Sequence, residues 1–265
     1  MLLLAIAAIK PDLVVVSGDL TQRARIAEFE SAAAFLAMLP APVLAVPGNH
    51  DIPLYNVVLR GLWPFERFRR YITDDLAPFF EDSEIAVLGV NTARARTFKN
   101  GRINRRQITS AISRFADCGS EATRIVVTHH AFDTPDVTTY GMITHKLVGR
   151  ATMALAGFRQ AGVDMILSGH QHSSAVGDSA ERYPALSRAI LLIQAGTATS
   201  TRRRGAVNAF NVLRITRPEV AVECLEWRPA DGSFATESTV SFGRTATGWS
   251  RSSRIEQRQP LFGGQ

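Results

Sequence analysis

Val46-Pro47-Gly48-Asn49-His50-Asp51 is the stretch from which the fold and the chemistry of this chain can be worked out. It follows a short apolar run, residues 42–46, that is typical of a buried strand, and Pro47 and Gly48 then end regular structure. A turn requires Gly48 and suits Asn49, but it needs neither His50 nor Asp51. Taken alone, the stretch is compatible with a polar turn that caps the next helix. The same arrangement recurs elsewhere in the chain, and the recurrence favours a functional interpretation.

Length and composition predict a single globular domain. The chain has 265 residues, of which 46% are hydrophobic and 20% charged, and this suits one α/β domain with a sizeable core. Its two cysteines, Cys118 and Cys224, lie far apart, which excludes a disulfide framework and a thiolate zinc site. Their number suits a reducing compartment, so we expect a cytoplasmic protein.

The N-terminus and the net charge bear on possible partners. Residues 1–10 are apolar but lack the pattern of a signal peptide and fall short of the ~20 residues of a membrane span, so no membrane partner is expected. The net charge of +6 is compatible with a nucleic acid or with a phosphate-bearing substrate. Most arginines are scattered, and the exceptions are two clusters: Arg102 with Arg105 and Arg106, and Arg202 with Arg203 and Arg204.

Hydrophobic patterning predicts alternating strands and helices. Five apolar runs are typical of buried strands: residues 13–16, 42–46, 85–90, 125–127 and 165–167. Three later runs have short connections and predict antiparallel strands: residues 189–193, 210–215 and 220–227. Residues 53–80 mix aromatics with arginines, which predicts either an excursion over a site or an irregular helical pair packed on the core. From residue 243 onward the chain is polar, and we expect a disordered tail.

Each of four predicted strands ends in a side chain that can bind a metal. These side chains are Asp19, Asn49, His129, and His170 with His172. In α/β sheets such groups converge beyond the carboxyl ends of the strands. Imidazole, carboxylate and amide oxygen suit divalent Zn, Mn, Fe or Co. A lone histidine is more often a satisfied polar residue, but five of the six histidines fall at these strand ends, which favours a metal site.

The ligand types suggest phosphoester chemistry. The carboxylate of Asp19 can bridge two cations about 3.5–4 Å apart, and such a pair turns bound water into hydroxide near neutral pH and offsets charge on a phosphoryl oxygen. The leaving oxygen then needs a proton or a positive charge, and His50 is next to the ligand Asn49. Asp51 could fix the orientation of this imidazole.

These residues resemble the motifs of the calcineurin-like metallophosphoesterase superfamily. The resemblance covers about residues 1–227 and rests on Gly18-Asp19, Gly48-Asn49-His50-Asp51, His129 and Gly169-His170-x-His172. Closest in look are bacterial class III cyclic-nucleotide phosphodiesterases and glycerophosphodiesterases. The resemblance implies a four-layer αββα sandwich with mixed sheets over residues 1–242, before a tail over residues 243–265. It also implies hydrolysis of small phosphoesters, of the phosphodiester type, at a dinuclear metal site.

The resemblance also implies a role for each residue. Asp19 would bridge the metals, and Asn49, His129 and His170 would hold one of them. His172 would bind the other metal, and His50 would act as acid or transition-state stabiliser. His130 would be a neighbour of the site without binding metal.

The chain departs from the family pattern at its start. The family's first strand, which ends in a D-x-H motif with two ligands, has no counterpart, and the chain begins about halfway through the helix that should follow. One metal site would then have only Asp19 and His172, fewer than the three protein ligands of a catalytic zinc site. The remaining histidine, His145, lies in a predicted loop. We expect that the sequence starts at an internal Met; the alternative is a natural metal-binding homologue with impaired catalysis.

Two further questions concern the substrate. A DNA nuclease is an alternative suggested by the basic charge, but no added DNA-binding domain is visible, so a nucleic-acid partner is not expected. Residues 202–204 could contact substrate phosphate or form a solvated run of charge.

Overall fold

A computed structural model describes residues 1–133, 147–179, 183, 188–199 and 207–260 of the chain. The helices are α1 (Leu2–Ile9), α2 (Ile26–Leu36), α3 (Val57–Leu62), α4 (Glu66–Tyr71), α5 (Arg105–Ala116) and α6 (Ala151–Gln160). The first eight strands are β1 (Val14–Val16), β2 (Val43–Ala45), β3 (Phe79–Glu81), β4 (Ile85–Gly89), β5 (Thr123–Val127), β6 (Met165–Ser168), β7 (Ala175–Asp178) and β8 (Leu191–Gln194). The last four strands are β9 (Ala209–Thr216), β10 (Glu219–Arg228), β11 (Ser233–Thr245) and β12 (Gly248–Pro260).

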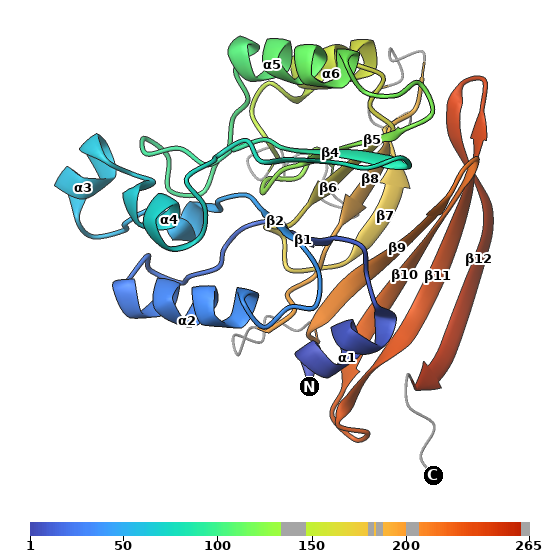
Figure 1. Ribbon diagram of the computed structural model, residues 1–265, viewed down its shortest axis with the longest axis horizontal. Helices are drawn as coiled ribbons and strands as arrows, with labels where there is room; N and C mark the ends of the chain where they lie inside the picture. Colours follow the sequence, from blue (N-terminus) through green and yellow to red (C-terminus); the bar gives the residue numbers. More distant parts are fainter. Residues whose placement is uncertain (134–146, 180–182, 184–187, 200–206, 261–265) are drawn as a thin grey trace.

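The central layer is a six-stranded mixed sheet in the order β3-β4-β5-β6-β8-β7. Strands β4, β5, β6 and β8 are parallel, and β3 and β7 add to the two edges in the antiparallel direction. Helices α5 and α6 cover one face, as Figure 1 shows at the top of the molecule. The buried side chains between them include Phe115, Leu155 and Phe158. This helix-covered, largely parallel sheet is what the apolar runs predict.

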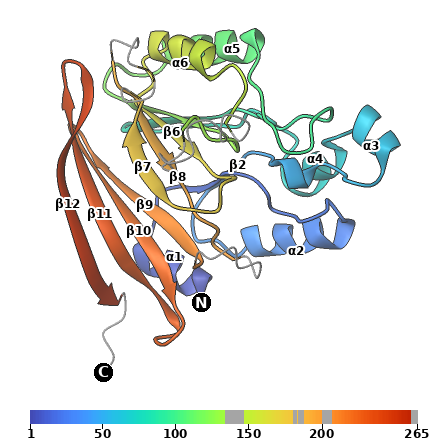
Figure 2. The same cartoon turned by 180° about the vertical axis from the view of Figure 1, so that it is seen from behind.

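The second sheet consists of β12-β11-β10-β9 and is antiparallel throughout. It packs on the opposite face of the central sheet, and side chains such as Val222, Phe242 and Trp249 fill the space between the two sheets. On its outer face Phe210 and Leu225 contact α1, which both views show lying against this sheet (Figures 1 and 2). Helices, sheet, sheet and helix therefore form the predicted four-layer αββα sandwich, and this fold class is confirmed.

Strands β1 and β2 form a separate two-stranded parallel sheet. Helices α2 and α4 cover it through Phe29 and Phe68, both fully buried. Helices α3 and α4 account for part of residues 53–80, so the irregular helical pair is observed; the segment also ends in the short strand β3, which was not predicted.

Two sequence predictions are wrong in this region of the fold. Residues 189–193 were expected to be antiparallel, but β8 pairs parallel with β6 and antiparallel only with the unpredicted β7. Residues 243–265 were expected to be disordered, but β12 pairs with β11 along its length up to Pro260. Composition misses this strand because backbone hydrogen bonds and one anchor, the 3% exposed Trp249, hold it despite its polar side chains.

A large cavity lies between β1, in the two-stranded sheet, and β9, the edge strand of the second sheet. It has a volume of about 1470 Å³, and its lining includes the whole of β1, apolar side chains of α1 and most of β9. Among the described strands, β1 pairs only with β2, and β9 pairs only with β10. Within the described residues, none of the helices has both the length and the apolar character needed to cross a membrane.

Candidate metal centre

The predicted ligands lie at the carboxyl ends of four strands. Asp19 follows β1, Asn49 begins a short 3-10 helix (Asn49–Asp51) after β2, His129 follows β5, and His170 follows β6. Within each pair the ends lie on the same side, because β1 runs parallel to β2 and β5 runs parallel to β6. The structure therefore brings together residues that are up to 151 positions apart in the chain.

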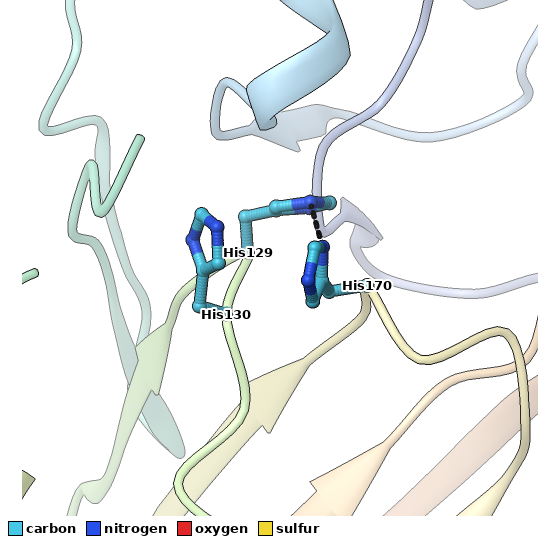
Figure 3. A group of neighbouring side chains, drawn as sticks. All are labelled: His129, His130 and His170. Atoms are coloured by element: carbon cyan, nitrogen blue, oxygen red, sulfur yellow. Dashed lines mark hydrogen bonds between the residues drawn. The ribbon is translucent and has the colours of Figure 1, made fainter. Parts of the chain in front are cut away.

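Four possible metal-donor atoms lie together: Nε2 of His129 and three atoms around it. Nε2 lies 3.1 Å from Oδ1 of Asn49, 3.1 Å from Nδ1 of His170 and 3.3 Å from Oδ2 of Asp19. Figure 3 shows the rings of His129 and His170 turned toward each other. Donors about 2.0 Å from a tetrahedral ion lie roughly 3.3 Å apart, so this spacing fits a divalent cation such as zinc.

The hydrogen bonds of these side chains also suit a metal. Nδ1 of His129 lies 2.7 Å from the carbonyl oxygen of Ser17, which only accepts, so Nδ1 carries the proton and Nε2 keeps its lone pair. Nδ2 of Asn49 donates to the carbonyl oxygen of Phe98 at 3.0 Å, which turns Oδ1 toward His129. The lone pair on Nε2 of His129 and the amide oxygen of Asn49 are therefore both directed to one point, where a cation could accept them.

Electrostatics prepares the same groups for a cation. Burial alone would raise the pKa of Asp19, but the charges and hydrogen bonds of His129 and His50 hold it well below its usual range. Burial, together with His129, lowers the pKa of His170 to about 4, so this ring is neutral at physiological pH. Burial opposes the charged form of His129 as well, but Asp19 outweighs it and raises the pKa of His129.

His130 belongs to the histidine cluster but its nitrogens are already used. It forms a group with His129 and His170 that could hold an ion. However, its Nδ1 lies 2.8 Å from the hydroxyl of Thr92, and its Nε2 lies 2.9 Å from the carbonyl oxygen of Lys99. The ring is fully buried, and burial with the nearby His129 lowers its pKa well below the usual value. These contacts support the expectation that His130 does not bind metal.

The structure fixes the ring of His50 and gives Asp51 other partners than the expected one. Nδ1 of His50 lies 2.8 Å from the carbonyl oxygen of Gln22, which fixes the ring. Asp51 was expected to orient that ring. Instead its fully buried carboxylate accepts hydrogen bonds from the backbone of Gly48 at 2.8 Å and of Thr21 at 2.9 Å. Asp51 therefore joins the loops after β1 and β2, while burial and Asp19 raise its pKa to about 6.

Two glycines allow these loops to touch. Gly18 has a φ of +93°, and a Cβ atom there would lie 2.7 Å from the nitrogen of Gly48. Gly48 has an ordinary φ of −96°, but its Cβ would lie 2.1 Å from Oδ1 of Asp19. Asp19 itself is in the left-handed region, at φ +57°, and so is His170, at +72°. Such backbone strain at non-glycine residues is characteristic of functional sites.

His172, the fifth predicted ligand, follows β6 and contacts Thr197. Its Nδ1 is 2.7 Å from the hydroxyl of Thr197. Asp19, His50 and His172 all line the large cavity between β1 and β9. A second cation here would have Asp19 and His172 as its ligands among the described residues.

The contributions of Ser17, Phe98 and Lys99 could not be predicted because they act through backbone carbonyl oxygens, which leave no trace in residue type. Thr92 follows the predicted strand 85–90, but a threonine at a strand end does not by itself indicate a metal site. His145 and residues 202–204 lie outside the described part of the chain.

A family model described as calcineurin-like phosphoesterase matches residues 2–174, which is more than half of the chain. No curated protein sequence matches. Among solved structures, the chain is similar to Vps29 of Chaetomium thermophilum, with 13% identity, a TM-score of 0.43, and coverage of 90% of this chain and 84% of that chain. Zinc-complexed Vps29 of Entamoeba histolytica has 15% identity, a TM-score of 0.44, and coverage of 89% and 86%. GAP50, described as the anchor in the inner membrane complex of Plasmodium, has 13% identity, a TM-score of 0.44, and coverage of 97% and 84%.

Proposed function

The chain belongs to the calcineurin-like phosphoesterase family, and from that premise we propose that it is a metal-dependent hydrolase of small phosphodiesters. Metal-dependent hydrolysis of phosphoesters is the activity that the family supports in general. The narrower choice of phosphodiesters, of the cyclic-nucleotide or glycerophosphodiester type, follows from the resemblance of the motifs around Asn49 and His170 to those of the corresponding enzymes.

The observation that carries the proposal is the four-donor cluster. His129, Asn49, His170 and Asp19 place two nitrogens and two oxygens at the spacing of a metal shell, on loops from four different strands. A divalent cation held there would supply the Lewis acidity that phosphoryl transfer to water requires. Mn, Fe, Zn and Co all suit this donor set.

The protein side chains supply proton transfer and orientation. The proton on Nδ1 of His50 points to the carbonyl of Gln22, so Nε2 is the atom that can exchange a proton with a leaving oxygen. The backbone N–H of His50 donates to Oδ1 of Asp19 at 2.9 Å, which ties this ring to the ligand loop. Proton transfer to the alkoxide would thus occur within one residue of the ligand Asn49.

For the second cation, we propose that further ligands come from an extended segment lying in the cavity between β1 and β9. Among the described strands, β1 pairs only with β2 and β9 only with β10, and both line this cavity together with Asp19 and His172. A strand that paired in the parallel direction with β1 would place its carboxyl end beside Asp19.

The test is hydrolysis of bis(p-nitrophenyl) phosphate, compared with p-nitrophenyl phosphate, in the presence of manganese. We expect the protein to hydrolyse the diester faster than the monoester, and His50→Ala to abolish most of that turnover. Metal binding without turnover would instead show a non-catalytic metal-binding homologue, and preference for the monoester would overturn the phosphodiester assignment.

A further inference from the structure

Arg60 is a buried arginine whose described partners are all carbonyl oxygens. Its side chain lies in α3, and the residue is 5% exposed. Nε donates to the carbonyl of Ala95 at 2.7 Å, one terminal nitrogen donates to that of Thr97 at 2.7 Å, and the other donates to that of Pro53 at 3.0 Å. Burial lowers the pKa of this guanidinium, which nevertheless stays charged. Arginine is rarely buried without a carboxylate, so this costly placement needs a reason.

The loop that Arg60 holds is the one that holds the metal centre. Arg60 contacts the carbonyl groups of Ala95 and Thr97. The next two residues of the loop, Phe98 and Lys99, contact the side chains of the metal centre. The carbonyl of Phe98 accepts from Nδ2 of Asn49 at 3.0 Å, and that of Lys99 lies 2.9 Å from Nε2 of His130. The guanidinium of Arg60 also lies over the ring of Phe98, 4.3 Å from its centroid.

The contact from Phe98 decides which atom of Asn49 faces the metal. With Nδ2 donating to this carbonyl, Oδ1 points to His129 at 3.1 Å. If the loop moved away, the amide could rotate and present its NH2 group, which has no lone pair for a cation. Groups that orient a ligand in this way affect metal affinity nearly as strongly as the ligands themselves.

We infer that Arg60 is a positioning residue for the metal ligand Asn49, acting through the carbonyl oxygen of Phe98. This inference rests on the proposed role of Asn49 as a ligand. It gives helix α3 a role in orienting a metal ligand, which could not be predicted from the sequence motifs or from the residues at the strand ends. Arg60 touches neither the cation nor the substrate.

The test is the binding of Co²⁺, followed by its visible absorption spectrum, in wild type, Arg60→Ala and Arg60→Lys. The control is Arg67→Ala. Arg67 is a half-buried arginine that donates to the carbonyl of Ala24 at 2.6 Å, and within the described residues it makes no hydrogen bond to the loop of residues 95–99. We expect Arg60→Ala to weaken Co²⁺ binding roughly 10–100-fold and to change its spectrum. Arg60→Lys, which can replace only part of the three-bond contact, should fall between Arg60→Ala and wild type, and Arg67→Ala should bind like wild type.

A double-mutant cycle separates positioning from general stability. If Arg60 acts through Asn49, then Arg60→Ala should weaken Co²⁺ binding less than about twofold in an Asn49→Ala background. An equal loss in both backgrounds, or unchanged affinity and spectrum in Arg60→Ala, would overturn the inference. Should Arg60→Ala fail to fold, the same comparison made with Arg60→Lys decides it. Failure of the wild type to bind Co²⁺ would refute the metal centre itself, and the inference with it.

Discussion

Replacing Gly48 with alanine should separate the two loops on which the metal centre is built. The backbone of Gly48 has a φ of −96° that any residue adopts, so the cost comes only from the added methyl group. That group would lie 2.1 Å from Oδ1 and 2.3 Å from the backbone nitrogen of Asp19, whereas ordinary contacts are 3.4 Å or longer. The loops must therefore move apart by about 1 Å or more.

The size of the effect follows from the hydrogen bonds that cross this contact. The carboxylate of Asp19 accepts from the nitrogen of His50 at 2.9 Å, and that of Asp51 accepts from the nitrogen of Thr21 at 2.9 Å. Hydrogen bonds to charged groups contribute about 1.5–3 kcal/mol each. Loss of both should lower the free energy of unfolding by about 3–6 kcal/mol, which is a large part of the stability of a typical domain.

Urea unfolding followed by circular dichroism measures this change. The matched control is Gly61→Ala in α3, where a new methyl group has nothing within 4 Å. Alanine in a helix interior is favoured over glycine by about 0.5–1 kcal/mol, so this control should be neutral or slightly stabilised. Equal unfolding midpoints for Gly48→Ala and Gly61→Ala would show that the close approach of the loops is not real.

Three further predictions concern the metal centre. His50→Ala should keep its bound Mn²⁺, measured by elemental analysis, and lose about 10²–10⁴-fold in turnover of bis(p-nitrophenyl) phosphate; release of the metal would mean that the proposed role of His50 is wrong. Asn49→Ala should weaken Mn²⁺ binding roughly tenfold or more in isothermal titration, and unchanged affinity would remove Asn49 from the ligand set. Metal affinity should fall as the pH drops below the raised pKa of His129, because the imidazolium that forms there has a proton on Nε2 that must leave before a cation binds; titrations with Co²⁺ between pH 5 and 8 that show no such slope would contradict the assignment of His129 as a ligand.

The parallel strands β4, β5 and β6 of the central sheet could be predicted because each is a short apolar run followed by a polar break. The length of the second sheet could not be predicted in the same way. Strand β12 consists largely of polar and charged side chains, and its neighbours rather than its composition decide its structure. Similarly, β8 follows short connections typical of antiparallel strands, but it lies in a parallel position because β7 occupies the edge beside it.

The convergence of the candidate ligands Asp19, Asn49, His129 and His170 could be predicted because each follows a strand at the same edge of the fold. The partners that orient these ligands could not be predicted, since Ser17 and Phe98 act through their backbone. Asp51 shows the opposite difficulty. Its position next to His50 suggested a shared role in catalysis, but a carboxylate in a tight turn can equally accept backbone N–H groups, and here it does so. Adjacency in sequence does not decide between these two uses.

Among the described strands, β1 and β9 each have one edge without a partner, and these edges bear on how the protein behaves in concentrated solution. An edge with unpaired N–H and C=O groups accepts strands from any chain that can reach it, including other copies of the same chain. Here both strands line one cavity, and β1 has none of the charged or proline residues that usually discourage such pairing. Colloidal stability of this polypeptide therefore depends on whether that cavity is filled. Any segment that occupies the cavity acts as a solubility element as well as a part of the fold.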